Sequence, residues 1–482
     1  MRKYIRLSII TLFLFVAHAC SDPLEEKTFT VLQPSDFFNT LEDAEITLNS
    51  VYGEIRHSNL KRDEVTLGEV CTDIALERNG GIFTWNEPIE EFVWNSAHQW
   101  LRNDWERRYR GIFNANVLID NIELISGDDD RLDEILAEAR FMRAFHYYLL
   151  FDRFGPVPLI TSSETAVTDR PARASRQEVI DFIISEYEAV VMELPVDAPP
   201  LGQWGRPTRG AVLTALAKFY MMLRDWDNAA DYTQQVMDLG VYDLFMEGNR
   251  IELFNPENQR DNEFIFVSSM SDTPNNTTGD GWLSHVVPRG YQWTYPPRQI
   301  FAAEYKIRTE FLDTFGPDDQ RLDAFLFEFV NADGDTIPLG QDDVRSLKFP
   351  EYPTQEASRS SDDYIWFRYA DVLLSRSEAL NELQGVNQES VDLLNMVRDA
   401  AGISQVTVGD FGDAQAFKDF LLAERGREFH TEALRRQDLI RHGKFIEQAV
   451  ARGKPAQDFH VLYPIPLTEL ERNPNLEQNT GY

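Results

Sequence analysis

The chain has 482 residues, of which 43% are hydrophobic, so it can build a sizeable core in one large domain or in two or three ordinary ones. Its formal net charge of −34 at pH 7 argues against nucleic acid and anionic lipid as ligands. The same charge disfavours anionic polysaccharides, unless the fold gathers a local basic patch. Only two cysteines are present, Cys20 and Cys71, and we expect Cys71 to be a small buried side chain.

The N-terminus has the layout of a bacterial secretory signal peptide. Three basic residues precede a short apolar run at 7–16, and small residues lead to Cys20. We therefore predict a signal peptide over 1–19, a lipid-anchored Cys20 and an extended tether over 20–38. Ala17-His18-Ala19 departs from the usual lipoprotein box and also fits the ordinary secretory peptidase. That alternative leaves Cys20 unmodified, and we favour acylation.

Helical spacing of apolar side chains predicts that most of the chain is α-helical. A capping box, Ser175-x-x-Glu178, marks the start of one helix that runs to Leu194. Other helices are predicted over 98–125 and 131–151, and in pairs over 208–223 with 226–239, 366–384 with 388–401, and 413–428 with 431–451. The pairs resemble tetratricopeptide units, in which each pair buries its apolar face against its neighbours.

The segment between about 240 and 365 has a different sequence pattern, without the helical spacing of apolar residues. Phe264–Val267 is predicted to be a strand, and 325–339 a hairpin that turns at Asp333-Gly334. Residues 271–297 are predicted to form a long loop, because they are rich in glycine, asparagine and aromatic residues. Long loops inside compact domains are usually functional.

No catalytic or cofactor motif is present. The chain lacks the zinc-protease, nucleophile-elbow, Walker and dinucleotide-binding patterns, and its histidines do not pair at metal-ligand spacing. Glu424, Arg425 and Glu428 share one helix face, where we predict a structural ion-pair network. We therefore predict a binding protein without catalytic activity, cofactor or metal.

Aromatic residues in polar loops are the candidate ligand contacts, because flat rings stack on sugars while neighbouring amides bind hydroxyl groups. For any one of these rings, packing in the core is the simpler explanation, but we expect at least one to contact ligand. The candidates are Trp85, Asn86, Trp282, Tyr291, Trp293 and Tyr295.

Several segments together resemble the SusD/RagB family of outer-membrane nutrient-uptake lipoproteins from Bacteroidetes. They are TLEDAE at 40–45, NSVYG at 49–53, EARFMRAFHYY at 138–148, FGPVPL at 154–159, RPTRGA at 206–211, RYADVLL at 368–374, ERGREF at 424–429, DLIRHGK at 438–444, LYPIP at 462–466 and NPNLEQNTGY at 473–482. They cover almost the whole mature chain and follow that family's order.

The resemblance implies a mainly α fold, an α/α superhelix of tetratricopeptide-like pairs with an irregular, loop-rich region that contains a few short strands. One compact body would span 39–482, with a helical region over 39–240 and variable ligand loops in 241–482. Arg140 and Arg143 would pair with buried carboxylates.

The resemblance also implies a function. A surface-exposed lipoprotein, anchored in the cell outer membrane, would capture oligosaccharides and pass them to a TonB-dependent SusC-like transporter. The tetratricopeptide-like side would dock on that transporter. A peptide-binding member of the same family and a surface polysaccharide hydrolase are the alternatives.

Overall fold

The computed structural model describes residues 38–77, 83–165, 169–271, 279–295, 299–301, 303–353 and 360–482. The signal peptide, Cys20 and the tether up to residue 37 lie outside these ranges. Phe38 is already buried in the core. Within the described part of the chain, no helix is long and apolar enough to cross a membrane. Cys71 is buried, as predicted.

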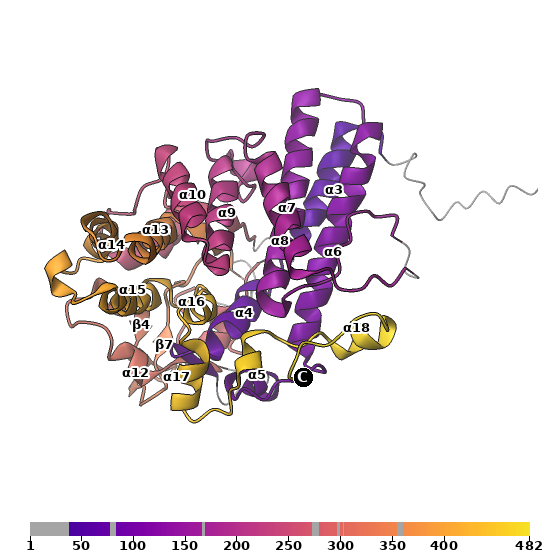
Figure 1. The fold of residues 1–482 in the computed structure, drawn as a ribbon. Helices are drawn as coiled ribbons and strands as arrows, with labels where there is room; N and C mark the ends of the chain where they lie inside the picture. The colour runs from indigo at the N-terminus through magenta and orange to yellow at the C-terminus, as the bar shows by residue number, and fades with distance from the viewer. Residues whose placement is uncertain are drawn as a thin grey trace, which may run out of the picture.

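Four long helices stand together on one side of the molecule (Figure 1). They are α3 (Leu41–Gly53), α6 (Gln99–Asn121), α7 (Asp129–Phe154) and α8 (Arg176–Val190). α7 packs against the other three and is buried on nearly all sides from Phe141 to Phe151. The predicted capping box is present, because Ser175 and Glu178 cap one another's backbone at the start of α8. This helix ends at Val190, four residues before the predicted end.

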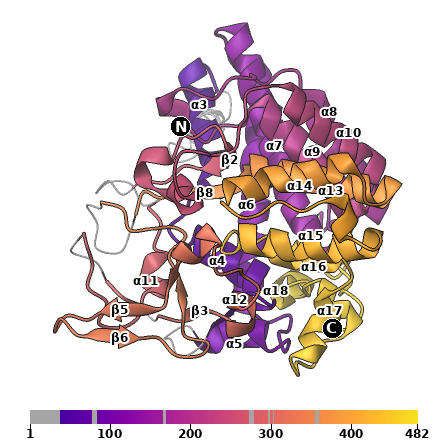
Figure 2. The ribbon, with the colours of Figure 1, turned by 90° about the vertical axis from the view of Figure 1, so that its left-hand side faces the viewer.

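Two predicted helix pairs are confirmed and lie side by side (Figures 1 and 2). α9 (Arg209–Leu223) packs on α10 (Trp226–Asp238), and α13 (Tyr369–Gln384) packs on α14 (Gln388–Ala400). α10 also packs against α13, which joins pairs that are far apart in the sequence. Buried Ala217 and Ala229 suit the close crossing of α9 and α10. α15 (Ala414–Phe429) lies against α13.

The predicted helix over 431–451 is wrong. Two short helices replace it, α16 (Arg435–Arg441) and α17 (Phe445–Ala451). Thr431 and Ala433 have left-handed backbone conformations, with φ of 67° and 63°, and helices do not continue through such residues. The buried carboxylate of Glu69 holds this turn, because it accepts hydrogen bonds from the backbone N–H groups of residues 431–433.

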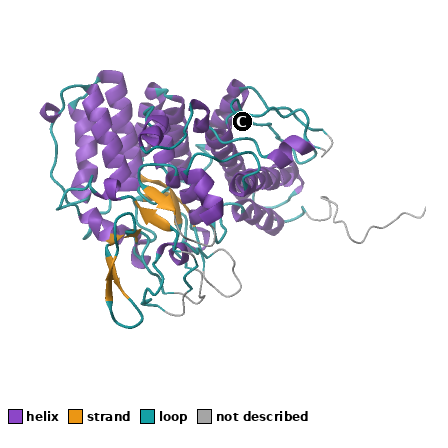
Figure 3. Ribbon diagram, turned by 90° about the horizontal axis from the view of Figure 1, so that it is seen from below, coloured by secondary structure: helices purple, strands orange, loops and turns teal. Residues whose placement is uncertain are grey.

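The remaining chain is irregular and carries short antiparallel strand pairs, seen in orange in Figure 3. β1 (Ala75–Glu77) pairs with β3 (Tyr305–Ile307), β2 (Phe264–Ser268) with β8 (Tyr364–Arg368), β4 (Phe325–Leu326) with β7 (Arg345–Ser346), and β5 (Glu328–Val330) with β6 (Thr336–Pro338). The predicted strand over 264–267 is confirmed, and so is the hairpin with its glycine turn, but its paired strands are 328–330 and 336–338, because residues 325–326 pair with β7 instead. The predicted start of a helix at 366 is wrong, because residues 364–368 form β8.

Short helical segments connect these elements. They are α4 (Leu60–Val65), α5 (Phe83–Glu90), α11 (Leu283–Val286), α12 (Thr309–Leu312), α18 (Leu467–Arg472), the π-helix η1 (Thr66–Val70) and the 3₁₀ turns η2 (Ile122–Leu124), η3 (Leu201–Gln203), η4 (Arg250–Phe254), η5 (Pro256–Asn258), η6 (Gln320–Ala324), η7 (Val408–Asp410) and η8 (Asp458–Val461). The long helices share one large hydrophobic core, and the irregular half has its own smaller core around Trp282 and Tyr305.

A buried ion-pair network lies where the strands meet the helices. Arg368, at the end of β8, donates to the carboxylates of Glu263 at 2.7 Å, Glu428 at 2.8 Å and Glu432 at 2.8 Å. Arg250 from η4 binds Glu263 and Glu428 at 2.6 Å each. The predicted structural role of Glu428 is confirmed.

The other predicted ion pairs are also present. Arg425 binds Asp371 and Asp438, each at 2.8 Å, in the interior. Arg140 and Arg143 share the carboxylate of Glu186, at 2.8 and 2.6 Å. The sequence motifs that contain Arg140, Arg143 and Arg425 therefore serve the scaffold.

We expect Arg368→Ala to reduce the free energy of unfolding by about 3–5 kcal/mol, because three buried carboxylates lose their shared cation. Urea denaturation followed by circular dichroism measures this loss. Arg472→Ala is the control, because Arg472 is 68% exposed and its pair with Glu469 lies on the surface. An unchanged urea midpoint for Arg368→Ala would show that the network contributes nothing to stability.

Glu424 predicts an acid-sensitive contribution to stability. Burial alone would raise its pKa, but the guanidinium groups of Arg321, Arg427 and Arg398 lower the pKa from its ordinary 4.5 to about 2. The stabilisation is therefore complete above about pH 4.5 and is lost as the pH falls towards 2. Glu424→Gln should be less stable than the wild type at pH 7, and this difference should shrink between pH 4.5 and 2.5. Urea midpoints across that range test the expectation, and a difference independent of pH contradicts it.

Candidate functional site

The first aromatic region is formed by α5 and the start of α6. Trp85 is 40% exposed, and its ring centroid lies 5.9 Å from that of Trp100, with the planes tilted by 41°. The indole N–H of Trp100 donates to Asn86 Oδ1 at 2.6 Å, and Asn86 is fully buried. Asn86 therefore fixes the orientation of Trp100 and does not face solvent, contrary to its predicted role as a ligand contact.

Charged and polar groups surround this pair of rings. The guanidinium of Arg62 lies 4.6 Å above the Trp100 ring and also binds Asp63 at 2.6 Å. His98 Nε2 donates to the Trp85 carbonyl at 2.6 Å, and burial lowers the pKa of this imidazole. The surface thus combines ring faces with hydrogen-bond donors and acceptors.

The second aromatic region follows α11 and lies along the β5–β6 hairpin. Tyr291 forms an isolated antiparallel bridge with Asn331, and its ring meets Trp293 edge-on at 5.4 Å. Glu351 holds the segment, accepting from the Tyr291 hydroxyl at 2.8 Å and from the Thr294 backbone N–H at 2.9 Å. Burial, followed by the Glu351 charge, raises the pKa of Tyr291.

The outer end of this segment is accessible. Tyr295 is 40% exposed, whereas Tyr291 and Trp293 are half-buried and Trp293 packs on the smaller core. The hairpin itself projects from the irregular half of the molecule (Figure 2). Of the predicted candidates in this region, Tyr295 presents most surface to a ligand.

The prediction that Trp282 contacts ligand does not fit the structure. Its side chain is 2% exposed and lies 4.7 Å, ring to ring, from buried Tyr305. A glycine-rich, polar sequence neighbourhood suggested a surface loop, but the short helix α11 turns this ring into the smaller core. Trp282 is a core residue.

Two residues of the first region were not predicted from the sequence. Trp100 looked like part of an amphipathic helix, and Arg62 belongs to a segment without any motif. Their proximity to Trp85 depends on tertiary packing of α4, α5 and α6, and sequence spacing carries no signal for it. In the described part of the chain, no group of three or more His, Cys, Asp or Glu side chains is placed to hold a metal ion.

Comparison with known families assigns the chain. A model described as "SusD family" matches residues 343–482, and one described as "Starch-binding associating with outer membrane" matches residues 25–221. The chain belongs to the SusD/RagB family. Both matched ranges agree with the segments on which the sequence resemblance depends.

Relatives of this SusD/RagB protein match it over most of its length. SusD-like protein P2 of Formosa agariphila is 26% identical over the whole of both chains. Starch-binding protein SusD of Bacteroides thetaiotaomicron is 24% identical, over 88% of this chain and 86% of that protein.

Solved structures confirm the mainly helical fold. A SusD homologue from Bacteroides thetaiotaomicron superposes with a TM-score of 0.80 at 21% identity, covering 93% of this chain and 98% of that one. A laminarin-binding SusD-like protein gives a TM-score of 0.79 at 21% identity, covering 92% and 100%. A surface glycan-binding protein A from Bacteroides thetaiotaomicron, in complex with laminarihexaose, gives 0.76 at 18% identity, also covering 92% and 100%.

Proposed function

We propose that this protein binds oligosaccharides at the cell surface and passes them to a TonB-dependent SusC-like transporter. The observation that carries the proposal is the accessible ring of Trp85, paired with Trp100 beside charged side chains. The names of its relatives support the ligand class, since they include starch-binding and laminarin-binding proteins.

The proposed binding chemistry follows from the residues present. An indole face offers a large, rigid apolar surface to the C–H face of a sugar ring, at little cost in side-chain entropy. Arg62 donates hydrogen bonds and Asp63 accepts them, which suits the hydroxyl groups at the edge of the same sugar. Such contacts hold a neutral sugar without requiring any charge on it.

The second aromatic region provides a further contact surface. Glu351 fixes the backbone of Thr294 and the hydroxyl of Tyr291, so the neighbouring Tyr295 ring is presented from a braced segment. Pre-ordering of this kind reduces the entropy lost on binding. We therefore propose Trp85, Trp100, Tyr291, Trp293 and Tyr295 as the ligand-contacting set.

Anchoring and partner complete the proposal. Two or three acyl chains on Cys20 would anchor the protein firmly in the outer membrane, whereas a single chain binds only marginally. The tetratricopeptide-like helices, with α9, α10, α13 and α14 side by side, would form the docking face for the transporter. In this scheme the protein binds and delivers its ligand without turnover.

The double variant Trp85→Ala/Trp100→Ala should bind oligosaccharides about tenfold more weakly or worse, because the stacking surface is lost. Isothermal titration with maltoheptaose, laminarihexaose and a tetrapeptide library measures the effect. Phe113→Ala is the control, since Phe113 is an aromatic residue of α6 that is 52% exposed and belongs to neither region. Unchanged sugar affinity in the double variant would refute the site. Binding of peptides alone, or cleavage of either sugar, would refute the function.

Protein purified from membranes of its native cells should carry acyl chains on Cys20 as its first residue. Intact-mass spectrometry, compared with a Cys20→Ser variant, measures the added mass. We expect the variant to leave the membrane fraction. An unmodified Cys20 at the mature N-terminus would exclude the lipid anchor while leaving the binding proposal standing.

A further inference from the structure

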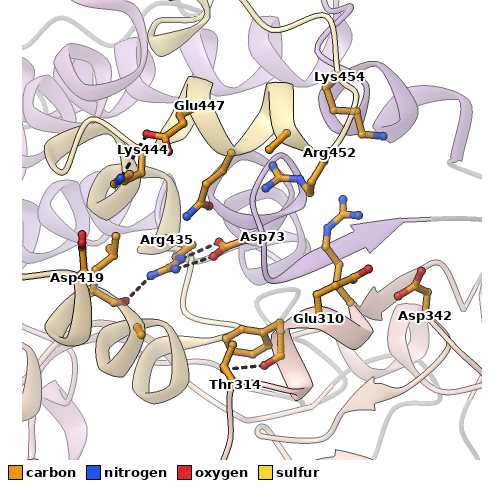
Figure 4. Close-up of a pocket in the computed structure, with 16 residues that line it drawn as sticks. Asp73, Glu310, Thr314, Asp342, Asp419, Arg435, Lys444, Glu447, Arg452 and Lys454 are labelled. Carbon is orange, nitrogen blue, oxygen red and sulfur yellow. Dashed lines mark hydrogen bonds and ion pairs between the residues drawn. The ribbon is translucent and has the colours of Figure 1, made fainter. Parts of the chain in front are cut away.

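A hollow of about 790 Å³ lies among α12, α15, α16, α17 and the turn after η1, apart from the aromatic residues described above. Figure 4 shows Arg452 and Lys454 on one wall, with Glu310 and Asp342 on the wall that faces them. Arg308 also lines the hollow. The charged lining is balanced between acids and bases, although acids outnumber bases 80 to 46 in the whole chain.

Most basic groups of the hollow are already neutralised by a carboxylate. Arg435 makes two bonds to Asp73, at 2.8 and 2.6 Å, and a third to a backbone carbonyl. Lys454 lies 2.6 Å from Glu91. These side chains have little capacity left for a ligand.

Arg452 differs from its neighbours. One of its guanidinium nitrogens donates to the Cys71 carbonyl at 3.1 Å, while its Nε is buried and has no hydrogen-bond partner. Among the described residues Arg452 forms no ion pair, and the nearby carboxylate of Asp73, whose charge acts on Arg452, is already bound to Arg435. The remaining nitrogen, Nη1, makes no hydrogen bond to the described residues and is not fully buried, so it is the donor that a ligand's acceptor can reach.

A second guanidinium, that of Arg308, lies near Arg452 and is only weakly paired. Its Nε donates to the Thr72 carbonyl at 3.1 Å, and its contact with Glu90 is 3.3 Å long. Burial, and after it the charge of Arg308, lowers the pKa of Arg452. The two like charges repel one another, and an anion bound to both would relieve that repulsion.

We propose that this hollow binds the anionic group of an acidic sugar, a carboxylate or a sulfate ester, through Arg452 and Arg308. Glu310, which is exposed, and Asp342 accept hydrogen bonds from hydroxyl groups of the same sugar. This role of the hollow extends the proposed function and rests on it for one premise, namely that the ligand is a saccharide.

The hollow and the first aromatic region are joined through one short helix. Glu90, the last residue of α5, contacts Arg308, and Glu91, which follows the helix, contacts Lys454. Trp85 lies near the start of the same helix. Glu90 lies five positions after Trp85 in this helix, a rise of about 7.5 Å. Neutral and acidic units of one saccharide chain therefore have separate, adjacent surfaces available.

Isothermal titration with trigalacturonate and with its methyl ester tests the proposal, because the two differ in charge and share the sugar skeleton. We expect trigalacturonate to bind the wild type at least about tenfold more tightly than the ester, and added salt to narrow that difference. Arg452→Gln should abolish the preference, and Arg452→Lys should retain part of it. Arg472→Gln, a change on an exposed surface pair, should leave it intact. Thermal melts of each variant establish that it is folded.

Further ligands separate the two possible anions. A preference for galactose 6-sulfate over galactose that is lost in Arg452→Gln supports the proposal with a sulfate ester as the anion. If each charged sugar binds no more tightly than its uncharged counterpart, the proposal is wrong. It is also wrong if inorganic sulfate binds as tightly as either charged sugar. If maltoheptaose and laminarihexaose bind but no charged sugar is preferred over its uncharged counterpart, only the proposed role of the hollow is refuted. If no saccharide of any kind binds, the proposed function itself fails.

Discussion

The position of every candidate contact depends on the buried network around Arg368. Arg368 is the last residue of β8, and the next residue begins α13. Its guanidinium therefore lies at the junction between the strands and the helix pairs. It binds carboxylates from three other segments, each almost completely buried. Because the charges are withdrawn from water, a shift of any one of these segments would leave a buried charge without its partner, which is costly. The irregular half is thereby fixed to the helical scaffold.

A second junction depends on one carboxylate, that of Glu69 in η1. In addition to its hydrogen bonds from the turn at 431–433, this carboxylate accepts a hydrogen bond from the Tyr305 hydroxyl at 2.8 Å. Burial raises the pKa of Glu69 to about 7. The neighbouring Gly68 is required here, because a Cβ atom would lie 2.4 Å from the Ala433 carbonyl oxygen. η1, β3 and the turn before α16 are thus held in one cluster. The hollow lies beside this cluster, since Asp73 and Arg308 come from the adjoining residues.

The sequence allowed the regular elements to be predicted, and the reasons are local. The helix pairs have a 3.6-residue apolar period, the β5–β6 hairpin has its Asp-Gly turn, and Ser175 caps α8. The failures are non-local in origin. Glu69 interrupts the predicted helix at 431 from a distance of 362 residues, and pairing with β2 makes a strand of residues 364–368. The partnership of Trp85 with Trp100, the burial of Trp282 and the isolation of Arg452 arise only from packing.

The strongly acidic charge of the molecule suits the aromatic surface at Trp85 and the hollow at Arg452 to different ligands. Many basic side chains are consumed by buried carboxylates, as Arg368, Arg425 and Arg441 are, so they contribute little to the outer surface. A strongly acidic exterior repels an acidic saccharide almost everywhere, and only a site with a cation that no carboxylate already neutralises can attract one. Stacking on Trp85 carries no such requirement and suits neutral sugars. An acidic sugar is therefore directed to the hollow by repulsion from the rest of the surface as much as by attraction to Arg452, and this combination makes the hollow selective.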